Sequence, residues 1–291
     1  MNNLRKSGAV HPPAYIRLAL ARLTLARLAF PMLAALLLCG GSVVADEAAS
    51  TVAEIADGAH RSDENRARNG YRHPAETLAF FGLERDMRVA EIWPAGGWYT
   101  EVIAPYFAGS DGTYIAAHWD PDSEVEFISK GVKGYIDKLA VHPDLYGNVE
   151  MAVLMYPDRM AFVPDESLDM IVTFRNIHNW MGRDYAEDMF ATMYKALKPG
   201  GTLGVVEHRG NAEVEQDPKA ASGYVNQDYA ITLAEDAGFK LVATSEINAN
   251  PKDTKDYETG VWTLPPTLRA GDEPEYRAIG ESDRFTLKFV K

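Results

Sequence analysis

The sequence has very little cysteine, since Cys39 is the only one among 291 residues. Cys39 lies in a segment that we expect to be removed, so disulfides and thiol chemistry are excluded for the remaining chain. Positive charge is also scarce: the first 45 residues hold five of the 29 basic residues and none of the 42 acidic ones. The remaining chain is strongly acidic and repels phosphates and anionic lipid, so we expect no nucleic-acid partner.

Long hydrophobic runs are absent, because the most apolar stretch, Leu28–Cys39, is too short to span a bilayer comfortably. The basic residues that precede it are Arg5, Lys6, Arg17, Arg22 and Arg27. Val43 and Ala45 suit signal-peptidase cleavage before Asp46. Residues 1–45 are therefore predicted to be a signal peptide that exports the chain, in the first instance to a periplasm, without stable membrane insertion after cleavage. The alternative is an uncleaved membrane anchor.

The composition, 46% hydrophobic and 24% charged, is that of a globular protein and excludes a disordered or collagen-like chain. Short apolar runs alternate with helical patterns, which favours βαβ units, a mostly parallel sheet and helices on both faces. The expected strands are Arg88–Trp93, Thr113–Ala117, Val149–Met155, Leu168–Phe174, Thr202–His208, Lys240–Glu246 and Phe285–Val290. The expected helices are Arg72–Gly82, Tyr99–Phe107, Glu124–Leu139, Tyr185–Leu197 and Tyr224–Ala237.

We expect one α/β domain over residues 71–291, preceded by an N-terminal arm at 46–70. The polar, alanine-rich part of this arm, Asp46–Glu64, is expected to be a loosely held helix or arm. The proline-containing connection at 248–283 is unusually long, and connections of that length are commonly functional or mobile. It is expected to form a cap over the carboxyl edge of the sheet.

The first expected strand ends in a turn, Pro94–Gly97, that leads into a helix near Trp98. Glycines let the backbone approach a ligand, and a helix start offers free N–H groups. A tight turn without a ligand is the alternative interpretation.

Three further elements follow in order: PDESLD ending at Asp169, LKPGG starting at Leu197 and LAEDAGF starting at Leu233. This series resembles the class I S-adenosylmethionine-dependent methyltransferases over about Ala75 to Val290. The stretches EIWPAGGWYTEVIAPY and FRNIHNW are similar to those of a bacterial group of exported predicted methyltransferases. The resemblance implies a Rossmann-like seven-stranded sheet with an antiparallel last strand, S-adenosylmethionine as cofactor and a small-molecule acceptor.

The same resemblance implies cofactor contacts around the first strand. Glu91 matches the acidic residue that helps to hold the amino-acid end of the cofactor. Trp93, Ala95 and Gly97 stand where the family usually has three glycines, so two of the three are replaced. Gly96 still gives the backbone of the turn the conformational freedom of glycine.

The ribose and adenine contacts are implied further along the chain. His118 occupies the position of the family's ribose-binding carboxylate, and Asp120 lies two residues further on, so either Asp120 takes over that contact or the contact is lost. Asp158 lies near the segment that contacts adenine, with a solvated loop carboxylate as the equal alternative.

Methyl transfer from a sulfonium needs alignment, exclusion of water and, for a protonated acceptor, a general base. His178 is the candidate base just beyond the fourth strand, with Asn176 and Arg175 as positioning groups, whereas a helix-cap or packing histidine is the competing interpretation. His118, His178 and His208 could share one rim, but no HxH or HExxH spacing supports a metal, and we predict none.

Aromatic residues gather at the expected rim and would suit an apolar or aromatic substrate, although core packing explains some of them equally well. They are Trp93, Trp98, Tyr99, Trp119 and Trp180. Tyr71–His73 is interpreted as the surface start of a helix, with a lid over the site as the alternative.

A non-catalytic exported binding protein on the same scaffold is the main competing function, because the glycine turn and the ribose position are both altered. A nicotinamide-dependent oxidoreductase is less favoured because no GxGxxG follows the first strand. The sequence predicts neither the oligomeric state nor the acceptor atom.

Overall fold

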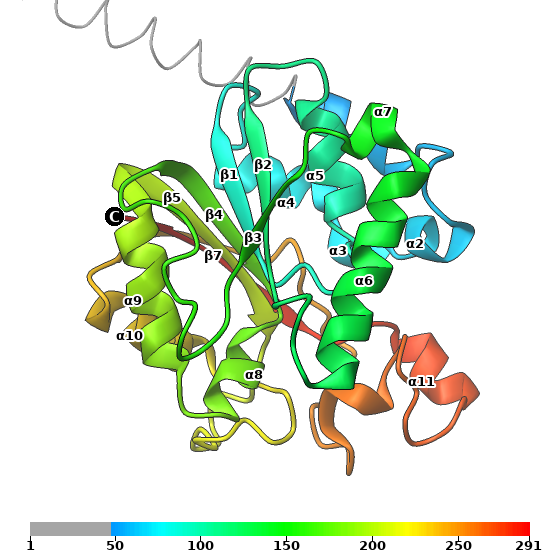
Figure 1. Cartoon of the computed structure of the whole chain (residues 1–291). Coiled ribbons are helices and arrows are strands. Elements are labelled where there is room, and N and C mark those ends of the chain that lie inside the picture. The colour runs from blue at the N-terminus through cyan, green and yellow to red at the C-terminus, as the bar shows by residue number, and fades with distance from the viewer. Residues whose placement is uncertain (1–47) are drawn as a thin grey trace, which may run out of the picture. The chain divides into compact units, whose positions relative to one another are not determined.

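The computed structural model describes residues 48–291, which belong to one compact unit, Ala45–Lys291 (Figure 1). The predicted signal peptide lies outside the described residues. Within residues 48–291, no helix combines the length and the apolar composition needed to cross a membrane.

A seven-stranded sheet in the order β3-β2-β1-β4-β5-β7-β6 forms the centre of the unit. Its strands are β1 Arg88–Ile92, β2 Thr113–His118, β3 Glu150–Val153, β4 Leu168–Phe174, β5 Leu197–His208, β6 Lys240–Ser245 and β7 Arg284–Val290. All neighbouring pairs are parallel except those of β7, which runs antiparallel to β5 and β6. This confirms the expected Rossmann-like sheet with an antiparallel last strand.

Helices cover both faces of the sheet, and each face has its own hydrophobic cluster. The longer helices are α4 Pro74–Phe81, α5 Thr100–Phe107, α6 Glu126–Val141, α9 Ala186–Ala196 and α10 Gln227–Asp236. The short ones are α2 Asp63–Ala67, α3 Asn69–Arg72, α7 Pro143–Tyr146, α8 Ile177–Met181, α11 Pro274–Ile279 and the 3-10 turn η1 Gly260–Thr263. In Figure 1, α9 and α10 lie on one side of the sheet and α4, α5 and α6 on the other.

The strand order reverses between β1 and β4, which are neighbours although β2 and β3 come between them in the chain. At such a reversal the connections leave in opposite directions, so the carboxyl ends of the two strands border a crevice. The turns after β1 and β4 are therefore the segments that can build a site.

The fifth strand starts earlier than the expected Thr202, because the LKPGG residues Leu197–Gly201 form the beginning of β5 and not a separate turn before it. Leu197 pairs with Leu168, and the register then shifts before Thr202 pairs with Met170. Gly200, with φ of 82°, takes up that irregularity. Other element ends differ from the expected ones by one to three residues at most termini, where apolar periodicity fades.

The segment expected to be a loosely held helix or arm does contain a helix, but that helix is packed against the domain. A helix over residues 48–56 buries Ala48, Val52 and Ala56 in the same hydrophobic cluster as α4 and α5. The reason is that alanine and valine recur at helical spacing on one face of this polar stretch.

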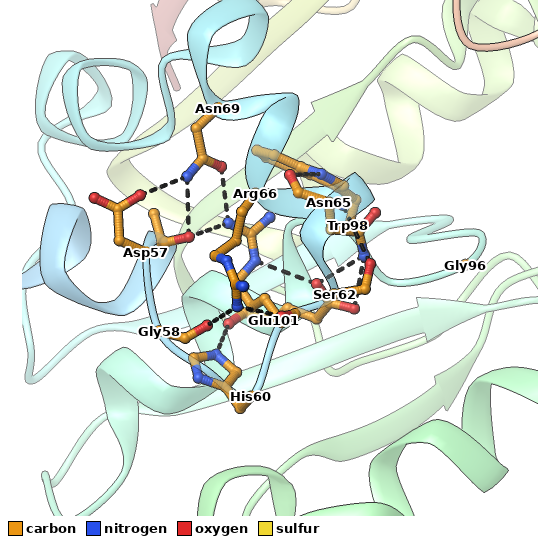
Figure 2. Close-up of polar contacts among 12 residues, drawn as sticks. Asp57, Gly58, His60, Ser62, Asn65, Arg66, Asn69, Gly96, Trp98 and Glu101 are labelled. Carbon is orange, nitrogen blue, oxygen red and sulfur yellow. Dashed lines mark hydrogen bonds and ion pairs between the residues drawn. The ribbon is translucent and has the colours of Figure 1, made fainter.

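The residues that follow this helix, 57–69, are held against the domain by hydrogen bonds and ion pairs to Glu101 on α5 (Figure 2). Its carboxylate accepts hydrogen bonds from Arg61 Nε at 3.2 Å, from Asn65 Nδ2 at 2.9 Å and from Lys138 Nζ at 2.6 Å. His60 Nε2 lies 2.9 Å from the Glu101 carbonyl oxygen. Because Glu101 is 5% exposed, these contacts form a buried polar anchor beside the turn after β1.

Candidate functional site

A cavity of about 340 Å³ lies at the carboxyl ends of β1 and β4. Its walls come from the turn after β1, the segment after β4, the beginnings of α5 and β7, and residues 261–267 of the long connection. Cavities that hold drug-sized ligands span roughly 300–1,000 Å³, so the volume suits a small molecule. Residues 261–267 border the cavity from the stretch expected to act as a cap.

The turn after β1 keeps the backbone shape that glycine favours even where glycine is replaced. Trp93, Ala95 and Gly97 have φ of 48°, 52° and 75°, all in the left-handed region. A side chain at positive φ costs about 1–2 kcal/mol per residue, and such strain is retained mainly where surrounding structure holds it. Strain at two successive replaced positions marks this turn as a candidate ligand cradle.

Trp93 does not fill the cavity, although it contributes to its wall. Its indole Nε1 donates a hydrogen bond to the Leu154 carbonyl at 2.9 Å. Its ring packs edge-on against Trp119 and Trp180, at centroid distances of 5.6 and 6.1 Å. Trp180 is fully buried and belongs to the core, whereas Trp98, Tyr99 and Trp119 border the cavity.

The two glycines of this turn are expected to respond differently to alanine. A Cβ at Gly97 would lie 2.9 Å from Tyr135 Cε2 and would force alanine into positive φ, whereas a Cβ at Gly96 meets nothing within 4 Å. We expect Gly97→Ala to lower the free energy of unfolding by about 1–2 kcal/mol, and Gly96→Ala to change it by less than about 0.5 kcal/mol. Urea unfolding of both variants measures this, and equal effects would contradict the described turn.

Glu91, at the end of β1, is 3% exposed and borders the cavity. Tyr114 and Thr100 donate hydroxyl hydrogen bonds to its Oε2 at 2.5 and 3.5 Å. Burial raises the pKa of Glu91 from its ordinary 4.5 to about 7, against the opposing effect of these hydrogen bonds. A cation in the cavity would favour its charged form.

His118 supports the turn instead of facing the cavity. Its Nδ1 accepts from the Trp119 N–H at 2.7 Å, so Nε2 carries the proton and donates to the Ala95 carbonyl at 3.1 Å. Burial lowers the pKa of His118, which keeps the ring neutral. Both ring nitrogens are used within the protein.

Four other expected cofactor positions are also not among the residues that border this cavity: Gly96, Gly97, Asp120 and Asp158. Asp120 pairs with Arg159 at 3.5 Å, and Asp158 is exposed in the loop after β3. The cofactor contacts of these residues and of His118 stay predictions. The cavity does bring together Glu91, Trp93 and Ala95 with the candidate catalytic residues Arg175, Asn176 and His178.

Asn176 and Glu207 fix the position of His178. Asn176 Nδ2 donates to the Ile92 carbonyl at 2.8 Å and so links the ends of β4 and β1. Glu207, at the end of β5, accepts hydrogen bonds from the backbone N–H groups of Ile177 at 2.6 Å and His208 at 2.8 Å. The start of α8 is thus capped by Glu207 and not by His178.

The same carboxylate holds the His178 ring, with Oε1 3.0 Å from Nδ1. An ionised carboxylate only accepts, so the Nδ1 of His178 carries the proton. Nε2 is then the nitrogen with a free lone pair in a residue that borders the cavity. This geometry allows His178 to act as a general base positioned by Glu207.

His178, Glu207 and His208 form a group whose possible ligand atoms lie within 4.8 Å of one another, without His118. The Glu207 oxygens already accept N–H hydrogen bonds. Burial, and after it His178 and the arginines at 284, 175 and 72, lower the pKa of His208 well below its ordinary value. Cationic surroundings oppose a divalent ion, so we interpret the group as a hydrogen-bonded cluster.

Arg72 is the clearest residue that sequence reasoning placed wrongly. It was expected at the surface start of a helix, but it is 3% exposed and borders the cavity. Its guanidinium stacks on Trp98 at 4.6 Å, and Arg61 lies 4.5 Å from the same ring. Arg284 was missed as well, since it had been assigned only to the neighbourhood of the last strand.

No protein-family model matches the sequence, and no curated protein matches it. The fold is similar to that of a SAM-dependent methyltransferase from Aquifex aeolicus, with 16% identity over 83% of this chain and 97% of that chain and a TM-score of 0.52. It is also similar to the [4+2]-cyclase SpnF, with 15% identity over 81% and 84% of the two chains and a TM-score of 0.53. At these identities the likeness shows the fold alone, and nothing in it supports the narrower resemblance to an exported group.

Proposed function

We propose that the chain transfers a methyl group from S-adenosylmethionine to a small-molecule acceptor. The observation that carries the proposal is the turn after β1, where three left-handed residues hold the backbone beside a cavity. The methyltransferase named above has this fold, and so does a cyclase, so the site itself must support the reaction. Export through residues 1–45 stays a prediction.

The residues around the cavity fit such a cofactor in charge and position. Glu91 would hold the ammonium end, and the main chain at Pro94 and Ala95 would lie along the nucleoside. The cofactor supplies an activated methyl group on a sulfonium. His178 would take the proton of the acceptor at Nε2, while residues 261–267 exclude water.

Binding of S-adenosylmethionine and its demethylated product, measured by calorimetry, tests the proposal. We expect both to bind the wild type and a nicotinamide dinucleotide not to bind. Absence of heat and of thermal shift at millimolar cofactor would overturn it and favour a non-catalytic binding protein. A response to the nicotinamide dinucleotide alone would favour an oxidoreductase.

The pH dependence of this binding tests Glu91. With its pKa raised to about 7, the charged form becomes more abundant as pH rises. Affinity for the cofactor should therefore increase by up to roughly tenfold per pH unit below pH 7 and level off above it. Glu91→Gln should remove this part of the dependence, and the exposed control Glu124→Gln should keep it.

Stability of the unliganded protein should change in the opposite direction. A carboxyl with a raised pKa contributes stability that is present at a pH below its ordinary pKa of 4.5 and lost as the pH rises through about 7.

The binding experiment has a clear contradicting outcome. If cofactor affinity depends on pH in the same way in the wild type and in Glu91→Gln, the role assigned to Glu91 is wrong.

A further inference from the structure

Four arginines lie close together beside the cavity, and we call them the arginine cluster: Arg68, Arg72, Arg175 and Arg284. All of them except Arg68 border the cavity. Glu281 pairs with three of them. Its Oε1 lies 2.5 Å from Arg68 Nε, and its Oε2 contacts Arg72 Nε at 3.2 Å and Arg284 Nη2. Within the part of the chain that the structure describes, the Arg175 guanidinium has no ion pair, although it borders the cavity.

The carboxylates nearby do not balance these four cations. Glu281 serves three arginines, Glu207 is engaged by N–H groups and His178, and Glu91 is partly protonated near neutral pH. Burial, followed by Arg284, lowers the pKa of Arg175 to about 10. The cluster therefore has surplus positive charge next to a cavity, which favours an anionic occupant.

Unmet hydrogen bonds point in the same direction. Among residues 48–291, three buried nitrogens of the cluster have no partner: Arg68 Nη2, Arg72 Nη1 and Arg284 Nε. Buried donors without a partner are uncommon in native proteins and call for an explanation such as an ion or ligand. Arg72 and Arg284 are both 3% exposed and both border the cavity, so the unpaired donors of these two residues belong to a built site.

The position of the cluster tells which part of the reaction it serves. Arg284 pairs in register with His208, whose ring lies 5.4 Å from that of His178. Arg175 stands three residues before His178, with its N–H fixed to the Val206 carbonyl at 2.7 Å. Both arginines thus flank the segment that carries the candidate base, and Arg175 is also close enough to Glu91 to oppose the rise of its pKa.

We propose that Arg175 and Arg284 bind an oxyanion, a carboxylate or a phosphate monoester, of the methyl acceptor. The inference rests on the proposed function and specifies its substrate class as acidic small molecules. Guanidinium groups match such oxyanions because their parallel N–H groups can donate two hydrogen bonds at once. The carboxylate of the cofactor is the other source of the same chemistry.

The experiment compares Arg175→Met with the exposed control Arg277→Met on α11, in full-length protein saturated with the demethylated cofactor. Because Arg175 has no ion-pair partner, its replacement should leave the fold stable. The probes are benzoate and phenyl phosphate, with neutral benzamide and matched chloride as controls. We expect one of the acids to bind the wild type and Arg277→Met with similar affinity. It should bind Arg175→Met at least tenfold more weakly, and benzamide should not bind any of the three proteins.

The cofactor provides the second arm. If the acceptor uses Arg175, the affinity for S-adenosylmethionine stays within about twofold in Arg175→Met. An unchanged affinity of all variants for both acids would overturn the inference, and so would absence of acid binding. The comparison is a cofactor analogue without the carboxylate, measured on the wild type. If Arg175→Met loses as much affinity for S-adenosylmethionine as the wild type loses for this analogue, Arg175 binds the cofactor's carboxylate and the inference is overturned. Failure of the proposed function is distinct, because the cofactor would then not bind any variant.

Discussion

Glu281→Ala is expected to lower the free energy of unfolding by about 3–5 kcal/mol, the usual cost of removing one partner from a buried charged group. Glu281 is 2% exposed and pairs with Arg68, Arg72 and Arg284. Burial favours its neutral form, but these arginines lower the pKa of Glu281 well below its ordinary range. Its loss leaves buried guanidiniums without compensation. Urea unfolding followed by tryptophan fluorescence measures the effect.

The exposed Glu275→Ala is the matched control and should change stability by less than about 0.5 kcal/mol. Combining Glu281→Ala with Arg284→Met should recover part of the loss, because one uncompensated cation is removed. If Glu281→Ala is as stable as the control, the described ion cluster is wrong. Because the pKa of Glu281 is lowered, its contribution to the free energy of unfolding is fully present at a pH above the ordinary pKa of a glutamate. That contribution is lost as the pH falls through the lowered pKa of the folded protein.

His178→Asn is expected to reduce the rate of methyl transfer by about 10²–10⁴-fold, the range over which a general base contributes. His178 borders the cavity, and because Glu207 holds its Nδ1, its Nε2 is left free to accept a proton. The assay follows labelled methyl from the cofactor to an acidic acceptor.

Glu207→Gln tests the positioning of that base. Glutamine has one acceptor oxygen where Glu207 has two, so it keeps the hydrogen bond of only one of the N–H groups of Ile177 and His208, and it removes the charge opposite His178 Nδ1. We expect an intermediate loss of rate, a shifted pH–rate profile and a changed tautomer of His178 in nitrogen-15 NMR spectra. A purely structural role would change the melting temperature and leave the profile and the tautomer as in the wild type.

The sheet was predictable from the sequence because each strand is a short apolar run between turn residues. The position of the cavity was predictable as well, since the turn after β1 and the segment after β4 meet where the strand order reverses. That Asn176 and His178 border it follows from their place after β4, whereas their roles stay predictions. The tight packing of the helix at residues 48–56 and the start of β5 at Leu197 were not predictable, because they depend on tertiary packing and on strand register.

The arginine cluster could not be predicted, because its contacts join distant parts of the chain. Arg72 and Glu281 are separated by 209 positions, and neither lies in a pattern that marks it as buried. Near the turn, the register of β1 with β2 places His118 where its ring hydrogen-bonds to the Ala95 carbonyl. The identity of the residue does not reveal this register. Hydrophobic periodicity identifies elements, whereas the pairing of buried charges depends on how those elements assemble.

The anchoring of residues 57–69 by Glu101 affects how the protein can be shortened. These residues lead directly into α3, whose last residue, Arg72, forms part of the cavity wall. The domain boundary expected from the sequence is residue 71. A chain that starts there would lose the Arg61–Glu101 ion pair and keep only Lys138 as ion-pair partner of Glu101. It would also lose the hydrogen bond from Trp98 Nε1 to the Asn65 carbonyl. A shortened chain that keeps these contacts and the buried helix before them therefore has to start near residue 48.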